Sequence, residues 1–370
     1  MRPRRRSAAP APRGTAPPTD NGAVPALPTP IPGLDGAAWR PLSLGDAAAF
    51  VRLQEAARVA DGGEEVMTDE VARRELTDPH CPVATNTLGL ALPDGSLAAS
   101  IMVHERLAGI AARRVFLWGV THPDRRRRGI GTTILGWGVA RADEILAASA
   151  DRRPGLVEAF RDERIRDAVA LHEDAGFRPV RWYVDMRRDL REAIPAAPDL
   201  GGLRIRGYGA AATDAQPPGA RWAERVRLAH NEAFTDHWGS EPIAVDVWAR
   251  DFVGDPSFRG DLSFVALAGD EVAGYTVNYV AEADWLATGI REGWVGQLGV
   301  RRPWRGRGVA TALLVRSMEA FRAAGLEAAI LGVDVENPTG ALGVYERVGF
   351  RPVRRSVRLQ RHAGGGSGAG

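Results

Sequence analysis

The sequence contains no lysine and a single cysteine, and each absence restricts what the chain can do. All 48 basic residues are arginines, so acetylation of the protein's own lysines is excluded. Cys81 has no second cysteine with which to form an intrachain disulfide, so the sequence carries no sign of an oxidising compartment. A structural thiol is the simpler interpretation of Cys81, and a reactive thiol is the alternative.

Long apolar runs and a strong net charge are also missing. No stretch of about 18 apolar residues is present, so no membrane span is predicted. The start, MRPRRRSAAPAPRG, is basic and rich in alanine and proline but lacks the apolar segment of a secretory signal. A net charge of +2 does not predict a nucleic-acid partner. We therefore expect a cytoplasmic protein, monomeric or homodimeric, that binds neither membranes nor nucleic acid.

What the sequence does contain is a repeat. The hexapeptide GFRPVR occurs at Gly176–Arg181 and again at Gly349–Arg354, 173 residues apart (349 − 176). Internal repetition is a primary guide to architecture, and 370 residues suffice for about two domains. The expected division is a disordered tail (1–36), a first half (37–190), a Pro/Gly-rich linker (191–202), a second half (203–362) and a second disordered tail (363–370).

Both halves show the same order of elements. In the second half the apolar patterns predict a strand at 203–206, helices at 221–234 and 245–252, a hairpin turning at Gly269-Asp270, a strand at 293–300, a long helix at 309–325, a strand at 326–335, a helix at 338–349 and a final strand. The first half repeats this order, with a strand at 113–120 followed by an arginine- and glycine-rich loop.

The loop between the predicted strand and the long helix is the most informative segment. It reads VRRPWRGRGVA at 300–310 and VTHPDRRRRGIG at 120–131. Glycines let the backbone approach a ligand, and a helix start presents unpaired amides, which together suit a phosphate or pyrophosphate group. A P-loop would need lysine, and a dinucleotide loop would need a third glycine where 311–313 read Thr-Ala-Leu. A surface turn, or a nucleic-acid-contacting patch at Arg125–Arg128, remains the alternative.

Two motifs resemble those of the GNAT (Gcn5-related N-acetyltransferase) superfamily. Arg305-x-x-Gly308-x-Ala310 resembles its acyl-coenzyme A signature, and Arg126-x-x-Gly129-x-Gly131 is similar. A second GNAT pattern places Asn, a small residue and Tyr twelve, eight and four positions before Gly-Phe. The second half matches it with Asn337, Ala341 and Tyr345, whereas the first half has Arg164, Ala168 and His172. The resemblance implies an α/β fold of two tandem GNAT domains, each a mixed, mostly antiparallel sheet flanked by helices.

The resemblance also implies acetyl-coenzyme A as co-substrate and assigns roles to individual residues. Asn337 would lie along the pantetheine arm, and Tyr345 would be the general acid for the departing thiolate. A packing role is the alternative for Tyr345. The other residues expected to bind coenzyme A are Leu298, Val300, Arg305, Gly306, Arg307, Gly308, Val309, Ala310 and Thr311 in the second half, and Val120, Arg126, Arg128, Gly129, Ile130, Gly131 and Thr132 in the first half.

The general base and the acceptor site are less directly indicated. Glu292, just before the strand that leads to the loop, is the favoured base, and Ala112 stands at its place in the first half. Glu282, Asp284 and His237 compete with it. His237 and Trp238 are candidates for the acceptor site, with helix packing or capping as the alternative.

These assignments predict an acetyl-coenzyme A-dependent N-acetyltransferase that acts on a primary amine of a small molecule. Transfer would be direct, in a ternary complex and without a metal. The second half would be catalytic and the first half degenerate, since it lacks the Asn, the Tyr and the base. It also has Arg127 where the second half has Gly306, a strained choice if that position needs a positive φ. A non-catalytic acyl-coenzyme A sensor or interaction module is the alternative.

Overall fold

The computed structural model of the chain describes residues 24–106, 112–209, 220–240, 242–337 and 340–364. The first half contains β1 (Ala38–Arg40), α1 (Ala47–Asp61), α2 (Asp69–Glu75), α3 (Val83–Asn86), β2 (Thr87–Ala91), β3 (Leu97–Arg106), β4 (Arg113–Thr121), α4 (Ile130–Ala148), β5 (Gly155–Asp162), α5 (Arg166–Asp174) and β6 (Arg178–Asp189). The second half contains β7 (Arg204–Gly207), α6 (Ala220–Ala233), α7 (Val245–Asp251), β8 (Phe264–Ala268), β9 (Glu271–Tyr279), α8 (Trp285–Thr288), β10 (Glu292–Val300), α9 (Val309–Ala323), β11 (Ala328–Asp334), α10 (Ala341–Arg347) and β12 (Arg351–His362). Short 3-10 helices cover Leu44–Asp46, Pro123–Arg125, Gly260–Leu262, Glu282–Asp284 and Arg302–Trp304.

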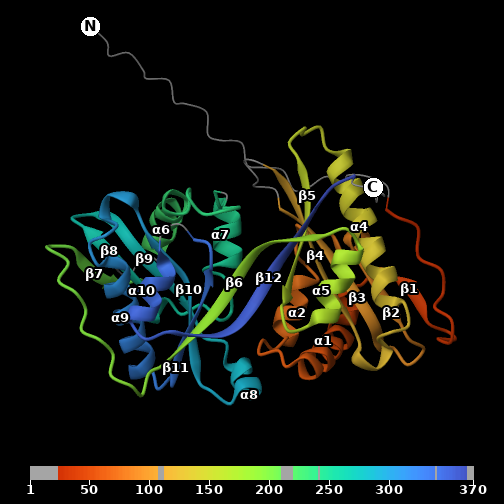
Figure 1. Cartoon of the computed structure of the whole chain (residues 1–370), viewed down its shortest axis with the longest axis horizontal. Coiled ribbons are helices and arrows are strands. Elements are labelled where there is room, and N and C mark those ends of the chain that lie inside the picture. The colour runs from red at the N-terminus through yellow and green to blue at the C-terminus, as the bar shows by residue number, and fades with distance from the viewer. Residues whose placement is uncertain (1–23, 107–111, 210–219, 241, 338–339, 365–370) are drawn as a thin grey trace, which may run out of the picture.

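All twelve of these strands form one continuous sheet, in the order β1-β2-β3-β4-β5-β12-β6-β11-β10-β9-β8-β7. The halves exchange their last strands: β6 pairs with β11 of the second half, and β12 pairs with β5 of the first half. Figure 1 shows these two long strands side by side, crossing from one half of the molecule to the other. Each half of the sheet therefore contains one strand supplied by the other half.

The repeated hexapeptide explains the symmetry of this exchange. It forms the turn into β6 and the turn into β12, and its glycines, Gly176 and Gly349, both have positive φ values of 86° and 91°. β6 and β12 are antiparallel, and Tyr183 pairs with Ser356. These two residues are also 173 positions apart (356 − 183), the same offset as the hexapeptides. A pseudo-twofold axis therefore passes through this pair and relates the two halves.

In each half, one parallel strand pair opens into a wedge. β4 pairs with β5 only from Arg113 to Phe116, and β10 pairs with β11 only from Glu292 to Trp294. Both β4 and β10 continue for several residues beyond that pairing. The other described pairings are antiparallel, so the sheet is mixed and mostly antiparallel, as predicted.

Helices cover both faces of the sheet because neighbouring strand residues point to opposite sides. Leu117 of β4 is buried in a cluster with Ile134 of α4. The next residue, Trp118, packs edge to face on Phe50 of α1 at a ring separation of 5.7 Å. In the second half, α9 packs on one face, whereas α6 and α7 cover the other.

The predicted hairpin is confirmed, with Ala268 paired to Glu271 across Gly269-Asp270. Cys81 is fully buried, and burial raises the pKa of its thiol to about 12, which fits a structural thiol. No helix within the described ranges is long and apolar enough to cross a membrane.

The expected tails and linker are only partly covered by the structure. Residues 1–23 and 365–370 lie outside the described residues. Within 24–36, however, Ile31 and Leu34 are buried in the core of the first half, where they belong to the same apolar cluster as Trp39. Residues 190–203 form neither helix nor strand, and Leu200 and Leu203 from this segment pack in the cluster at the start of α9. The boundary between the halves stays a prediction.

Candidate functional site

The loop between β10 and α9 has the backbone of an anion-binding turn. Gly306 and Gly308 adopt left-handed conformations, with φ of 72° and 77°. The first helical hydrogen bond of α9 runs from the amide of Ala312 to the carbonyl of Gly308, at 2.9 Å. The amides of Val309, Ala310 and Thr311, which precede Ala312 in the first turn, therefore have no helical acceptor and remain available to a phosphate.

Arg305, the first residue of the coenzyme motif, is turned inward. Its Nε donates to the carbonyl of Val300 at 3.1 Å, and its guanidinium also binds Asp236 at 3.0 Å and the carbonyl of Ala233 at 2.7 Å. The side chain thus ties the loop to the end of α6. We infer that its contribution to coenzyme binding is to hold the loop in shape.

The first half builds the same anchor. Arg126 donates to the carbonyl of Thr121 at 3.3 Å and forms a two-pronged ion pair with Asp61, at the end of α1, at 2.6 and 2.8 Å. The loop continues through Arg127, which has a φ of 62° and is the one non-glycine residue with positive φ in the described part of the chain. Both halves thus have a positive φ at this position, which is strained for Arg127 and unstrained for Gly306.

The remaining residues that the sequence predicts to bind coenzyme A differ in how exposed they are to solvent. Val309 and Ile130 point into the core, so only their backbones are available to a ligand. Arg307, Arg128 and Thr132 are exposed. Those that line or flank the two turns are Leu298, Val300, Gly306, Gly308, Ala310 and Thr311 in the second half and Val120, Gly129 and Gly131 in the first half.

Two predicted residues of the second half meet across its wedge. Nε2 of His237 lies 2.9 Å from Nδ2 of Asn337, which follows β11. The preceding residue, Asp236, binds Arg305 on the β10 side. The segment after α6 therefore connects the loop between β10 and α9 to the turn after β11.

Trp238 lies against the first half. The guanidinium carbons of Arg358, Arg181 and Arg114 lie 5.0, 5.3 and 5.6 Å from the centre of its ring. Arg358 also binds Glu158, which is completely buried. The structure thus gives Trp238 a cation–π packing role between the halves.

Tyr345 and its counterpart His172 are both buried but differ chemically. Burial raises the pKa of Tyr345 to about 12, and its hydroxyl has no hydrogen-bond partner among the described residues. Tyr345 therefore keeps a proton that it can donate. Burial lowers the pKa of His172 to about 3, and its ring lies 2.7 Å from the carbonyl of Ala168 and 3.1 Å from Arg161. His172 is thus a neutral packing residue.

Glu292 lies at the closed end of the wedge, paired in the sheet with Ala328. Its carboxylate accepts a hydrogen bond from Nε of Arg187 at 2.7 Å, and Arg187 also binds Glu64 at 2.9 Å. Burial raises the pKa of Glu292, although the ion pair with Arg187 opposes this. The role of Glu292 as base stays a prediction.

The competing acids occupy a different environment. Oδ1 of Asp284 accepts a hydrogen bond from the amide of Val66 at 2.7 Å, and burial raises the pKa of this carboxyl to about 6. Glu282, two residues earlier, is exposed. A pKa of about 6 suits proton transfer near neutral pH.

A cavity of about 340 Å³ opens where β10 leaves β11. It is lined by Glu65, Asp251, Phe252, Asp255, Ser257, Tyr279, Ala281, Trp294, Gly296 and Gln297. β10 has a bulge here, because Val295 and Gln297 pair with the adjacent residues Asn278 and Val277. A Cβ on Gly296 would lie 2.3 Å from the ring of Tyr279, so a larger residue at this bulge would have to displace that ring.

Part of the wall of this cavity comes from the first half. In the loop after α1, Glu65 binds Arg354 at 3.1 Å, and its neighbours Glu64 and Val66 bind Arg187 and Asp284. The corresponding loop of the second half reaches in the opposite direction and carries Trp238 into the first half.

The matching place in the first half is filled. Thr121 corresponds to Val300, because their carbonyls accept from Arg126 and Arg305, an offset of 179 (300 − 121). β4 has no bulge in its pairing with β3, so before Gly296 the offset is 178, and Phe116 corresponds to Trp294 (294 − 116) and Arg114 to Glu292 (292 − 114). Arg114 lies against Trp238, and the guanidinium of Arg358 lies 5.0 Å from the ring of Phe116. The cross-half loops therefore complete a cavity in the second half and fill its counterpart.

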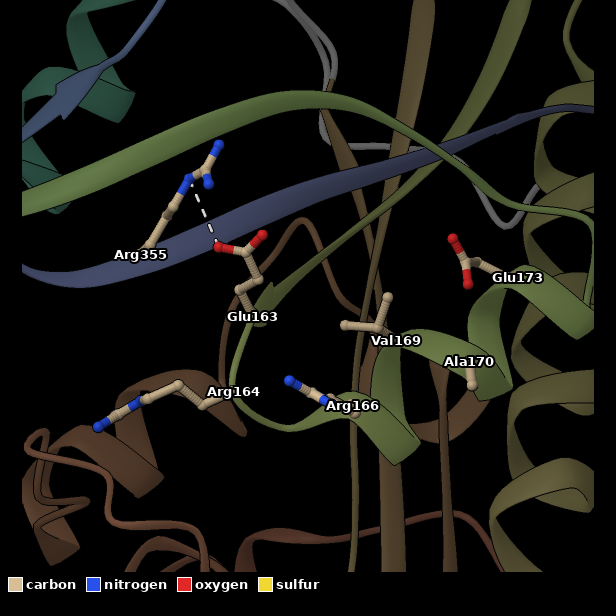
Figure 2. Close-up of a pocket in the computed structure, with 7 residues that line it drawn as sticks. All are labelled: Glu163, Arg164, Arg166, Val169, Ala170, Glu173 and Arg355. Carbon is tan, nitrogen blue, oxygen red and sulfur yellow. Dashed lines mark ion pairs between the residues drawn. The ribbon is translucent and has the colours of Figure 1, made fainter.

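A larger cavity, of about 550 Å³, lies in the first half (Figure 2). It is lined by Glu163, Arg164, Arg166, Val169, Ala170, Glu173 and Arg355. Figure 2 shows the α5 residues along one side of this space and Arg355 of β12 across it, paired with Glu163 at 3.4 Å. Leu171 points elsewhere, toward the loop glycine Gly131, where a Cβ would lie 3.2 Å from it. None of the residues that line this cavity belongs to the loop between β4 and α4.

Sequence reasoning missed the residues that build the cavity at the β10 bulge. Trp294 and Tyr279 belong to strands that the sequence predicts, but strand patterns do not reveal a bulge beyond the hint of Gly296 within a strand. Glu65 and Arg187 come from the other half of the chain, and no local signal marks them. No group of three or more His, Cys, Asp or Glu side chains arranged to hold a metal occurs within the described ranges.

The duplicated wedges, each followed by a glycine turn and a helix, define the fold of a tandem acetyltransferase. Comparisons with known proteins agree: the model of the acetyltransferase (GNAT) family matches residues 223–350. A mycothiol acetyltransferase of Nocardiopsis dassonvillei is 30% identical over 308 residues, covering 80% of this chain and 88% of the relative. One from Parafrankia sp. is 28% identical over 350 residues, covering 88% and 98%.

Solved structures agree as well. A GCN5-related N-acetyltransferase from Sphaerobacter thermophilus superposes with a TM-score of 0.68 at 27% identity, covering 91% of this chain and 97% of that one. A tandem GNAT protein from the clavulanic acid biosynthesis pathway has a TM-score of 0.62 at 18% identity, covering 90% and 100%, and supports the fold alone. The chain belongs to the GNAT family. It is an N-acetyltransferase with tandem GNAT architecture, and this family uses acetyl-coenzyme A.

Proposed function

We propose that the second half transfers an acetyl group from acetyl-coenzyme A to a primary amine of a small molecule, directly and in a ternary complex. The observation that carries this proposal is a difference between the halves. Within the described residues, the second half combines the anion-binding turn, a protonated buried Tyr345 and a cavity at the β10 bulge. The first half has the turn, but His172 replaces the tyrosine and Trp238 fills the place of the cavity.

The chemistry follows from where these groups lie along β10. The amine attacks the acetyl carbonyl carbon, and the backbone amide around Leu298, just past the bulge, would stabilise the oxyanion that forms. When the intermediate collapses, the C–S bond breaks and Tyr345 donates its proton to the departing thiolate. A pKa of about 12 keeps Tyr345 protonated at physiological pH, but it also makes the phenol a weaker acid than a thiol. The donation must therefore be coupled to return of a proton to Tyr345, which the nitrogen of the collapsing intermediate can supply.

The incoming ammonium must first lose a proton. Glu292 is our proposed base, acting through water, and its raised pKa is consistent with proton transfer. Its ion pair with Arg187 would have to loosen during turnover. Asp284, without an arginine partner among its described hydrogen bonds and with a pKa of about 6, is the alternative.

The relatives suggest where to begin the search for the acceptor. Because the similar sequences are named mycothiol acetyltransferases, an amine related to mycothiol is the first acceptor to assay, followed by a broad panel of small amines. Coenzyme binding without turnover of any amine would instead favour the acyl-coenzyme A sensor.

The substitution Tyr345→Phe tests the proposal. Removal of a positioned general acid typically costs at least about 100-fold in rate, so release of free coenzyme A thiol should fall by that factor. The affinity for acetyl-coenzyme A, measured by calorimetry, should be unchanged. Tyr183→Phe, a tyrosine at the pseudo-twofold axis, is the matched control and should retain activity. Full activity of Tyr345→Phe would remove this residue from the mechanism.

A further inference from the structure

We propose that the acceptor is a di- or polyamine whose second ammonium group is bound by Glu65 of the first half together with Asp251 and Asp255 of the second half. This inference rests on the proposed function, because it takes the cavity at the β10 bulge as the acceptor site. It assigns the first half a direct part in substrate recognition.

The charge of the cavity lining supports a cationic ligand. Three carboxylates, Glu65, Asp251 and Asp255, line it, and no arginine or histidine does. Their arginine partners lie outside the lining: Arg354, Arg250 and Arg74 hold the three carboxylates from behind. Arg354 and Arg250 are shared with two further carboxylates, Asp185 and Asp78, so the carboxylates in these ion pairs outnumber the arginines. This excess of negative charge fits a ligand with a second positive charge.

Asp255 is rigidly placed and ionised. It accepts hydrogen bonds from Nη1 of Arg74 and from the hydroxyl of Ser257, both at 2.6 Å. Burial would raise the pKa of Asp255, but these hydrogen bonds outweigh burial and lower it. Asp255 therefore presents a fixed negative charge, and such a charge favours an ammonium that carries several donors.

The rest of the lining suits the hydrocarbon chain between two amines. Phe252, Tyr279 and Trp294 supply aromatic surface that can pack against methylene groups and interact with an ammonium through cation–π contact. Gly296 and Gln297 mark the end of the cavity at the bulge, where the reacting nitrogen would lie.

Glu65 reaches the cavity only because the halves are joined by ion pairs. Its loop is held at three consecutive residues: Glu64 by Arg187, Glu65 by Arg354, and the amide of Val66 by Asp284. The side chain of Glu65 itself is 76% exposed, so its carboxylate remains accessible to a ligand. Its arginine partner, Arg354, lies on the exchanged strand β12.

The test compares 1,4-diaminobutane with 1-aminobutane as acceptors for the full-length protein and acetyl-coenzyme A. We expect kcat/KM to favour the diamine, and Glu65→Gln to reduce that preference about threefold to tenfold, as for an accessible charge pair. Glu70→Gln removes an exposed carboxylate of α2 that does not line the cavity and should leave the preference unchanged.

A second variant separates recognition from a structural effect. Arg354→Gln breaks the same ion pair, but Glu64–Arg187 and Val66–Asp284 still hold the loop and leave the Glu65 carboxylate in place, so the diamine preference should persist. Equal loss of the preference in Arg354→Gln and Glu65→Gln would overturn the inference, as would turnover of 1-aminobutane with no diamine preference in the wild type. Coenzyme binding without turnover of any amine would overturn the proposed function and, with it, this inference.

Discussion

At the scale of single residues, the two halves differ most where a titratable group is buried. Tyr345 and His172 hold equivalent positions, yet burial keeps the tyrosine protonated and the histidine neutral. Burial disfavours the charged form of either group, so the chemistry left at each site depends on the side chain. A buried phenol retains a proton to donate, whereas both ring nitrogens of His172 lie within hydrogen-bond distance of other groups, the carbonyl of Ala168 and the guanidinium of Arg161.

Asp284 provides a pH-dependent prediction at the same scale. Burial raises its folded-state pKa to about 6, above the ordinary value of 3.8, so folding favours the protonated carboxyl. Its contribution to the free energy of unfolding is therefore complete below pH 3.8 and is lost as the pH rises through about 6. Asp284→Asn keeps an oxygen that can accept from Val66 but does not titrate.

Urea unfolding from pH 4 to 7 measures this effect. Relative to wild type, Asp284→Asn should gain stability progressively as the pH rises through 6, whereas Asp270→Asn, on the exposed β8–β9 turn, should track the wild type. A constant difference between Asp284→Asn and wild type across this range would show that Asp284 is not buried as described.

At the scale of elements, the exchanged strands leave each half with a strand edge that is paired by a strand of the other half. β11 is covered on one side by β6, and β5 is covered by β12. β6 and β12 begin with the same hexapeptide and occupy equivalent places about the pseudo-twofold axis. β12 of a second copy could therefore take the place of β6.

This equivalence predicts that a fragment of residues 191–370 forms a dimer. Without β6, the edge of β11 is exposed, and an exposed edge invites pairing with another chain. Each copy would supply β12 to the β11 of the other, a domain-swapped arrangement with closed symmetry. Light scattering coupled to size exclusion should give twice the fragment mass. A folded monomeric fragment would mean that β12 can turn back onto its own β11.

The loops and turns were the most predictable elements. The glycine turn before α9, the hairpin at Gly269-Asp270 and the start of α9 at Val309 all follow from local sequence, because turn residues and helix periodicity act over a few positions. The anchoring role of Arg305 did not follow, because its partner Asp236 lies 69 residues away.

At the scale of the whole molecule, the sequence predicted two copies of one fold but not how they join. Identical hexapeptides cannot indicate which half each following strand completes, and the exchange is decided by the pairing of β6 with β12. The same limit applies to the site. Glu65, Trp238 and Arg187 act across the junction, so their contacts depend on the assembled sheet rather than on neighbouring residues.

The central claim is that the second half binds acetyl-coenzyme A and performs the reaction, whereas the first half supports it. A matched pair of substitutions places one carboxylate in the first turn of each loop helix, Thr311→Glu in α9 and Thr132→Glu in α4. An acidic residue is compatible with a helix N-terminus, so both variants should fold, but it would repel a pyrophosphate bound there.

The most direct measurement is the rate of coenzyme A thiol release at a fixed amine concentration, as a function of acetyl-coenzyme A, for these two variants. The account predicts that Thr311→Glu raises the KM for acetyl-coenzyme A on the order of tenfold or more, while Thr132→Glu stays within about twofold of wild type. A large effect of Thr132→Glu together with an unaffected Thr311→Glu would contradict the account and assign catalysis to the first half.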